Sequence, residues 1–140
     1  MIAPVQILVL IGWLLLSAAC LAAWRWGGKP ERQGALLILA VTLVFSVAGF
    51  IPDKALMRGV YLALDGALAV GLLLLALRHA AGWLGVAVLL QGVQFSLHAY
   101  YLVAERRYDQ LYATVNNLVT LGVLCSLLVG AIWANRRAAK

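Results

Sequence analysis

The chain alternates between five long apolar stretches and short polar breaks. Each stretch contains almost no charge and runs for about 18–25 residues, enough for a helix to cross a hydrocarbon layer roughly 30 Å thick. The pattern therefore predicts an all-α protein with one integral membrane domain, a compact bundle of five transmembrane helices. The predicted spans cover about residues 2–24, 34–51, 59–78, 83–104 and 111–133.

The polar breaks contain residues that end and begin helices. Gly27 and Gly28 precede Pro30, a combination typical of a turn that leads into the first turn of a helix. Asp53 stands just before the third stretch, where its carboxylate can cap a helix longer than the apolar segment alone. We found no strand-like alternation and no internal repeat.

The composition of the chain indicates the environment in which it folds. Of 140 residues, 65% are hydrophobic and 11% are charged, which leaves no room for a second domain and suits a lipid bilayer. The net charge of +6 does not indicate nucleic acid, because the cations lie singly or in pairs at the ends of apolar stretches.

The distribution of cations predicts an orientation. With the N-terminus outside, seven cations lie inside: Arg25, Lys29, Arg32, Arg78, Arg136, Arg137 and Lys140. Four lie outside: Lys54, Arg58, Arg106 and Arg107. The positive-inside rule therefore favours an N-out, C-in topology. Tryptophans then gather near the inner interface and tyrosines near the outer one.

Small residues recur at a spacing of four on three of the predicted helices. In lipid, such residues allow the close helix contact that hydrophobic burial does not supply. We expect contacts within the chain, or with a partner, at Ala63, Ala67, Gly71, Gly92, Ser96, Gly122, Ser126 and Gly130.

A few strongly polar side chains interrupt the spans at similar depth, in the predicted outer half. This candidate cluster contains Asp65, Gln91, Gln94, His98, Asn116 and Asn117, and Thr42 and Ser46 could face the same pocket. Steps of three and four place Gln91, Gln94 and His98 on one helix face. A charge in hydrocarbon costs roughly 2.5–3.5 kcal/mol on insertion scales, so Asp65 must be protonated, paired or beside water, with His98 the obvious partner.

The cluster permits three interpretations: a structural hydrogen-bond network, a polar pocket for a small ligand or lipid head group, and a proton or ion relay. Other chemistry lacks support. His79 and His98 are predicted near opposite faces, so one chain cannot supply both axial ligands of a haem. Cys20 and Cys125 lie within apolar runs and are expected to be free thiols. We therefore expect no catalytic residue, no metal site and no cofactor.

Several segments resemble small bacterial multi-spanning inner-membrane proteins. The similarity includes the loop Trp24-Arg25-Trp26-Gly27-Gly28-Lys29-Pro30-Glu31-Arg32, Asp65 early in a span, Leu77-Arg78 at its end, and Gln91 to His98. It would cover most of the chain from Trp24 onward and departs after Arg78, where that family tends to have a polar, tryptophan-rich turn. The resemblance implies a bacterial inner membrane and recurrent polar positions, and no activity.

These observations favour a small, non-enzymatic integral membrane protein that acts by association. It would be an accessory subunit of a larger membrane complex or a homo-oligomer, with the polar cluster orienting helices or holding a small ligand or lipid. An alternative is a small transporter or channel that moves protons or a solute with Asp65 and His98. A third hypothesis is a lysis-type pore former.

Overall fold

The computed structural model describes residues 4–139 and contains five α-helices over that range, without a strand. The helices are α1 (Pro4–Trp26), α2 (Lys29–Ala48), α3 (Lys54–His79), α4 (Gly82–Val103) and α5 (Gln110–Ala139). Each is long and apolar enough to cross a membrane. The predicted all-α fold of five such helices is confirmed.

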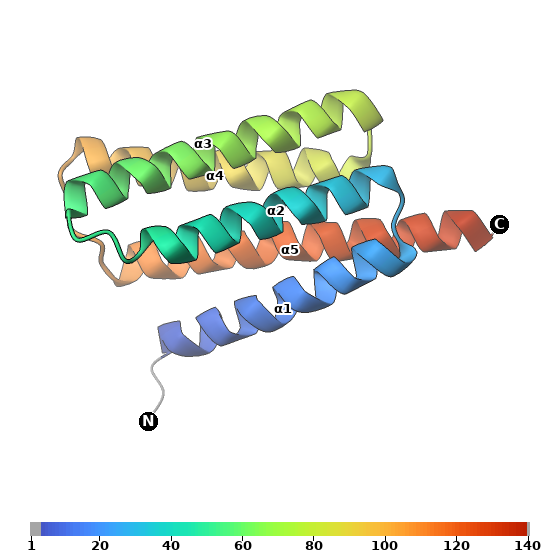
Figure 1. Ribbon diagram of the computed structural model, residues 1–140, viewed down its shortest axis with the longest axis horizontal. Helices are drawn as coiled ribbons and strands as arrows, with labels where there is room; N and C mark the ends of the chain where they lie inside the picture. The colour runs from blue at the N-terminus through green and yellow to red at the C-terminus, as the bar shows by residue number, and fades with distance from the viewer. Residues whose placement is uncertain (1–3, 140) are drawn as a thin grey trace.

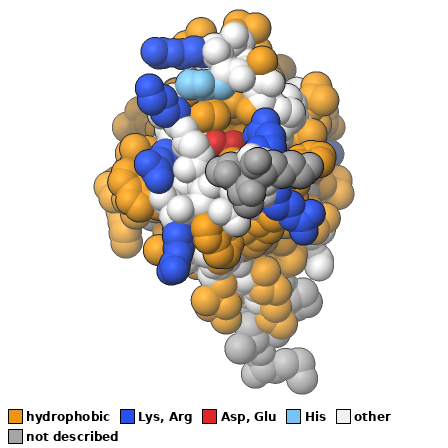
Figure 2. Space-filling model, turned by 90° about the vertical axis from the view of Figure 1, so that its right-hand side faces the viewer, with side chains coloured by type: hydrophobic (Ala, Val, Ile, Leu, Met, Phe, Trp, Pro, Cys, Tyr) orange, Lys and Arg blue, Asp and Glu red, His pale blue; other side chains and the backbone are white. Residues whose placement is uncertain are grey.

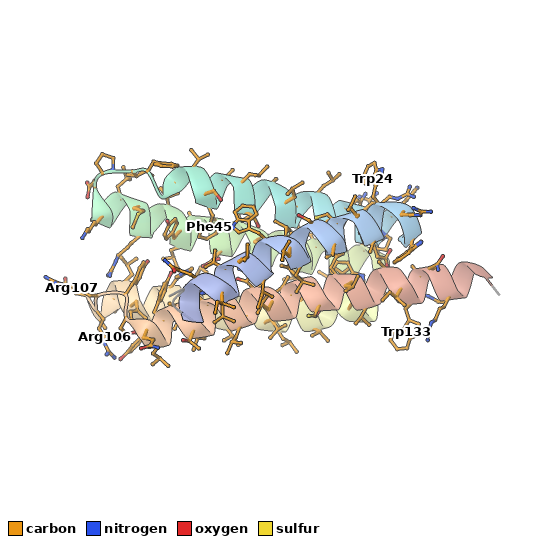
Figure 3. All side chains as sticks on the ribbon, turned by 90° about the horizontal axis from the view of Figure 1, so that it is seen from below. Trp24, Phe45, Arg106, Arg107 and Trp133 are labelled. Atoms are coloured by element: carbon orange, nitrogen blue, oxygen red, sulfur yellow. The ribbon has the colours of Figure 1, made fainter. Side chains whose placement is uncertain are left out.

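The helices run side by side and alternate in direction (Figure 1). The pairs α3–α4, α4–α5 and α2–α3 are in contact, and α1 packs mainly against α5 and also against α2. Helix α1 crosses the bundle obliquely, so its N-terminal half diverges from α2 (Figures 1 and 3).

The two ends of the bundle differ in chemistry. The basic end carries the α1–α2 and α3–α4 turns and the C-terminal part of α5, with Arg25, Lys29, Arg32, Arg78, Arg136 and Arg137. The aromatic end carries the α2–α3 and α4–α5 turns, with Tyr100, Tyr101, Tyr108 and Tyr112. Trp24 and Trp133 lie toward the basic end, and Arg106 and Arg107 lie at the aromatic end (Figure 3).

Capping chemistry decides where two helices begin. Asp53 caps α3, because its Oδ1 accepts hydrogen bonds from the backbone N–H groups of Ala55 and Leu56. The expected Asp53 cap is therefore confirmed. Helix α2 begins at Lys29 and ends at Ala48, whereas its apolar span was predicted at about residues 34–51. Pro30 lies in its first turn, as the sequence predicted, and Glu31 stabilises this start by accepting from the N–H of Gly28 at 3.0 Å.

Helix α5 also differs from its predicted bounds. It continues to Ala139 instead of ending near residue 133. Arg136 and Arg137 occupy its last turn, where cations interact favourably with the C-terminal end of the helix dipole. The loss of hydropathy after Trp133 therefore marks the end of the apolar span and not the end of the helix.

Three of the predicted small residues lie at contacts between helices. A Cβ atom on Gly71 would lie 2.6 Å from Leu37, and one on Gly122 would lie 2.9 Å from Leu90. Gly130 faces the indole of Trp83, which also contacts Gly34. Trp83 is buried between α2 and α5, so the absence of side chains at both glycines makes room for its ring.

The remaining predicted small residues do not show this close contact within the chain. Ala63, Ala67 and Ser96 are exposed, and a Cβ atom on Gly92 would meet nothing within 4 Å. Ser126 is half-buried and donates a hydrogen bond to the carbonyl of Gly122. Contact of these positions with a partner stays a prediction.

Candidate functional site

Asp65 of α3 lies at the centre of the polar cluster and is 1% exposed. Its Oδ1 accepts a hydrogen bond of 3.1 Å from Nε2 of Gln91. Its Oδ2 is paired with Nδ1 of His98. Gln91 and His98 are seven residues apart on α4 and therefore share one face of that helix. Both oxygens of the buried carboxylate are thus held by a single neighbouring helix.

His98 connects this pair to a third helix. It is 2% exposed, and its Nε2 is the hydrogen-bond partner of the Tyr112 hydroxyl on α5. Asp65, His98 and Tyr112 therefore form a continuous buried chain across α3, α4 and α5. The sequence suggested the first two residues as a pair, and it had placed Tyr112 only among the interfacial tyrosines.

The amides of the cluster form a second set of contacts. Gln94 donates through Nε2 to Oδ1 of Asn116 at 2.6 Å, which joins α4 to α5. Asn117 instead donates to the carbonyl of Ala113 within its own helix. Asn117 was expected beside Asn116 in the cluster, and it takes part by lining the adjacent cavity rather than by joining the hydrogen-bonded network.

A cavity of about 210 Å³ adjoins the cluster and lies among all five helices. Its polar lining consists of Thr42, Asp65, Gln91, Gln94, Asn116, Asn117 and Thr120. The facing wall is apolar and includes Trp13 and Leu16 of α1 and Phe45 of α2. A cavity of about 150 Å³ can hold benzene, so this one has room for a ring or a short chain.

Thr42 faces the cavity as expected, and Ser46 does not. The Ser46 side chain is exposed and donates to the backbone carbonyl of Thr42. The expectation for Ser46 is therefore wrong. It lies one helical turn beyond Thr42 toward the end of α2, and Phe45 is the last α2 residue that lines the cavity.

The amides of the cluster keep hydrogen-bonding capacity that the protein does not use. Among the described residues, Oε1 of Gln91, Oε1 of Gln94 and Oδ1 of Asn117 have no hydrogen-bond partner. Nδ2 of Asn116 likewise has none. All four residues line the cavity. Because buried polar groups normally find partners, the cavity can accommodate a molecule with acceptors and donors of its own.

An aromatic and charged cluster closes the aromatic end. The ring of Tyr108 stacks on Tyr112 with centroids 3.8 Å apart, and the guanidinium of Arg58 lies 4.2 Å from the Tyr108 centroid. The Tyr101 hydroxyl donates to Asp109 at 2.7 Å and holds the pKa of that carboxyl below its ordinary value. The backbone N–H of Tyr112 donates to the same oxygen, which orders the start of α5.

A second buried carboxylate lies at the basic end. Glu31 is 1% exposed, and its Oε1 has no partner among the described residues. Figure 2 shows this end of the molecule, with Lys and Arg side chains around the rim and an acidic side chain recessed near the centre. Glu31 was not predicted from the sequence to have a role, although its place three residues after Gly28 and before an apolar run is typical of a cap.

The structure and the comparisons add no other candidate chemistry. Within residues 4–139, no group of three His, Cys, Asp or Glu side chains is placed to hold a metal ion. Cys20 and Cys125 are free thiols. Comparison of the chain with protein-family models, curated proteins and solved structures finds no match.

Proposed function

We propose that the chain is a non-enzymatic integral membrane protein whose intramembrane cavity binds a small amphipathic molecule. One observation carries this proposal: the cavity has amide and carboxylate groups on one side and aromatic and aliphatic side chains on the other. A ligand with a polar group and an apolar body would match both walls. This function gives the polar cluster a role beyond orienting helices.

The unused amide atoms favour a ligand over a purely structural network. A network that only fixes helix rotation is most stable when every member is satisfied, because an unpaired polar group in a low-dielectric interior is costly. Here the pairs Gln91–Asp65 and Gln94–Asn116 still leave an oxygen on each glutamine beside the cavity. Water or a ligand would supply the missing partners.

The position of the cavity suggests how a ligand enters. Its α1 lining runs from Leu8 to Leu16 and its α2 lining from Ile38 to Phe45, which places it in the half of the bundle nearer the aromatic end. The N-terminal half of α1 diverges from α2 in this region (Figures 1 and 3). We propose that an amphipathic molecule enters from the lipid between these two helices.

The proposed topology is N-out and C-in, in a bacterial inner membrane. The basic end would face the cytoplasm, because it holds most of the cations and is flanked by Trp24 and Trp133, which suit a membrane interface. The cavity then lies in the outer half of the bilayer. Its ligand would come from the outer leaflet.

The protein would work as a subunit of a larger membrane complex or as a homo-oligomer. The exposed small residues Ala63 and Ala67 on α3, and Gly92 and Ser96 on α4, form the surface proposed for this association. A lysis-type pore former remains a weaker alternative that no particular contact favours. A proton-translocating role is favoured by one observation, the chain Asp65–His98–Tyr112.

Filling the cavity tests the binding proposal. Gly12 lines the cavity and has open space around its Cβ direction, so Gly12→Phe should place a ring inside without a backbone clash. Gly85 has equal space, lies outside the cavity and is not part of the proposed association surface, so Gly85→Phe is the matched control. Native mass spectrometry of the protein stripped from mild detergent should show a small-molecule adduct on the wild type and the control, and not on Gly12→Phe.

Two outcomes would contradict the proposal. One is a wild-type protein without any adduct after purification from its own membrane. The other is the same adduct on Gly12→Phe, which would locate the molecule outside the cavity.

A further inference from the structure

We propose that Asp65, His98, Tyr112 and Tyr108 form a proton path that connects the cavity with the aromatic end. The inference rests on the proposed function to the extent that the cavity is its inner terminus. The added activity is proton transfer between the cavity and the aromatic end. Binding in the cavity would then depend on protons supplied from that end of the bundle.

The path begins at a group that both faces the cavity and is held in place. Asp65 lines the cavity, and its Oδ1 accepts from Gln91 while its Oδ2 is paired with Nδ1 of His98. The Gln91 contact restrains the carboxyl group, so Oδ2 stays directed at the imidazole. A proton that reaches Asp65 from a ligand or from water in the cavity therefore has a defined next acceptor.

The imidazole passes the proton between its two nitrogens. Nδ1 faces Asp65 and Nε2 faces the Tyr112 hydroxyl, so the ring bridges an acid and a phenol on opposite edges. In one passage the Asp65 proton moves to Nδ1, and the Nε2 proton moves to the Tyr112 oxygen. Tyr112 then releases its own hydroxyl proton. Only O–H and N–H bonds break and form, and each group gains one proton for the one it loses.

The path returns to its starting state by reorientation. Asp65 is again a carboxylate, His98 is neutral with its proton on Nδ1, and Tyr112 is again a phenol. Exchange of the imidazole tautomer and rotation of the phenol O–H make the path ready for another proton. Histidine suits this role because its two nitrogens can carry a proton in turn.

Tyr108 provides the exit. It stacks on Tyr112 with an interplanar angle of 1° and is half-exposed, whereas Tyr112 is 8% exposed. A proton released by Tyr112 therefore reaches water beside Tyr108, at the start of α5. The Tyr108 pKa is raised by burial, which keeps its phenol protonated and able to exchange through its hydroxyl.

Other charged and titratable groups surround the path without interrupting it. Helix α3 contributes Tyr61, whose ring centroid lies 6.3 Å from that of His98, and Arg58, which lies over Tyr108. Helix α4 contributes Tyr101, whose hydroxyl is engaged by Asp109. Helix α2 presents the apolar ring of Phe45, 6.3 Å from His98. The Tyr61 hydroxyl makes no hydrogen bond to any member of the path among the described residues.

The path leads to one side only. From the cavity toward the basic end, the described core is apolar, with Leu72, Leu84 and Leu127 each fully buried. No alternating series of polar groups crosses this layer in the described residues. The chain therefore links the cavity to the aromatic end and does not by itself carry protons across the whole bundle.

Exchange of the His98 ring protons tests the path. The full-length protein with ¹⁵N-labelled histidine is placed in lipid nanodiscs, and deuterium exchange at the imidazole is followed by NMR after transfer to D₂O. A His79→Gln background leaves His98 as the one histidine signal. Tyr112→Phe should slow exchange by roughly 100-fold, the low end of the effect of losing a positioned proton-transfer group. Tyr61→Phe removes a hydroxyl from a neighbouring ring outside the path and should leave the rate unchanged.

A second variant keeps the proposal testable if Tyr112→Phe does not fold. Tyr112→Phe keeps the ring that stacks on Tyr108 and should fold, and its thermal unfolding midpoint is measured beside the exchange rate. If it unfolds, Tyr108→Phe removes the exit hydroxyl at a half-exposed position and should also slow exchange, by less. Wild-type exchange rates in the folded tyrosine variants would overturn the proposal.

Failure of the path and failure of the binding proposal give different results. One result is that Gly12→Phe removes the adduct while Tyr112→Phe leaves the exchange rate unchanged. It would support the binding cavity and contradict the proton path. The opposite result is that Tyr112→Phe slows exchange in a protein that never carries an adduct. It would support the proton path and contradict the binding of an amphipathic ligand.

Discussion

Asp65 and Glu31 are equally buried carboxylates with very different surroundings. Each is 1% exposed. Asp65 has side-chain partners for both oxygens, Gln91 and His98, which come from another helix. Glu31 has one partner, the backbone N–H of Gly28 at the start of its own helix, and its second oxygen has none among the described residues.

The difference shows that burial alone does not make a carboxylate part of a site. Glu31 is a helix cap in the first turn of α2, at the basic end, where the field of the cations offsets its charge without a fixed ion pair. Asp65 lies among apolar helices, where the nearest compensation is a single imidazole. We therefore expect the two carboxylates to respond differently to the loss of a neighbour.

The largest expected effect is at the Asp65–His98 pair. His98→Ala would leave Asp65 buried beside an empty space, and breaking a buried pair in this way costs about 3–5 kcal/mol. The free energy of unfolding in mixed micelles, measured by denaturant titration, should fall by this amount. The double variant Asp65→Leu with His98→Leu should recover most of the loss, because it removes the buried carboxylate together with its partner.

A loss of less than about 1 kcal/mol in His98→Ala would contradict this account, since a buried unpaired carboxylate should cost more. It would mean that water in the cavity already solvates Asp65. The contrast with Glu31 would then disappear.

A smaller effect is expected at Glu31. Glu31→Ala removes the acceptor of the Gly28 N–H and should cost about 1 kcal/mol of the free energy of unfolding, as cap losses do. Glu31→Gln keeps an oxygen for the Gly28 N–H and removes the charge, so it should be nearly neutral. The same denaturant titration measures both.

If Glu31→Gln destabilises the protein as strongly as His98→Ala, the distinction drawn here between Glu31 and Asp65 is wrong. The charge of Glu31 would then be needed to offset the surrounding cations. In that case stability should also depend strongly on salt concentration, because those cations are exposed.

The smallest effect is expected at Asp109, an exposed carboxylate that extends the comparison to the aromatic end. Its pKa is lowered chiefly by the Tyr101 hydroxyl, then by the N–H of Tyr112. A lowered folded-state pKa stabilises the fold above the ordinary value of 3.8, and this contribution is lost as the pH falls below 3.8 through the folded-state pKa. The difference in thermal midpoint between wild type and Asp109→Asn should therefore shrink on acidification.

A difference that stays constant from neutral to acidic pH would show that the Tyr101 contact does not favour the ionised form. Tyr101→Phe serves as the matched variant. It should reproduce part of the Asp109→Asn effect at neutral pH and, like Asp109→Asn, show a weaker loss of stability on acidification.

Hydropathy and local cap chemistry were enough to predict the five helices and the Asp53 cap. Both signals are local, since the mean apolarity of a stretch and the reach of a side chain to a backbone N–H do not depend on the rest of the fold. The turn before Pro30 predicted this residue in the first turn of α2, whereas hydropathy alone failed there because Lys29 and Glu31 are charged yet helical. Hydropathy failed again at the end of α5, where Arg136 continues the helix beyond the apolar span.

The composition of the site was only partly predictable. Periodicity placed Gln91, Gln94 and His98 on one face of α4, and the structure has all three buried. Periodicity within one helix cannot say which residue of another helix faces them. For this reason Tyr112 and the apolar wall of the cavity did not emerge from the sequence, and Ser46 was placed wrongly.

The sequence by itself determined that the chain forms five apolar helices and that a few polar side chains must find partners within them. The tertiary structure alone decided which partners they found, because that depends on the rotation of each helix about its axis and on which helices are neighbours. Apolar side chains do little to set this rotation where every face is apolar, so close packing at glycines and contacts between polar groups determine it. Asp65 thus became part of a chain through His98 to Tyr112, while Glu31, equally buried, remained a cap.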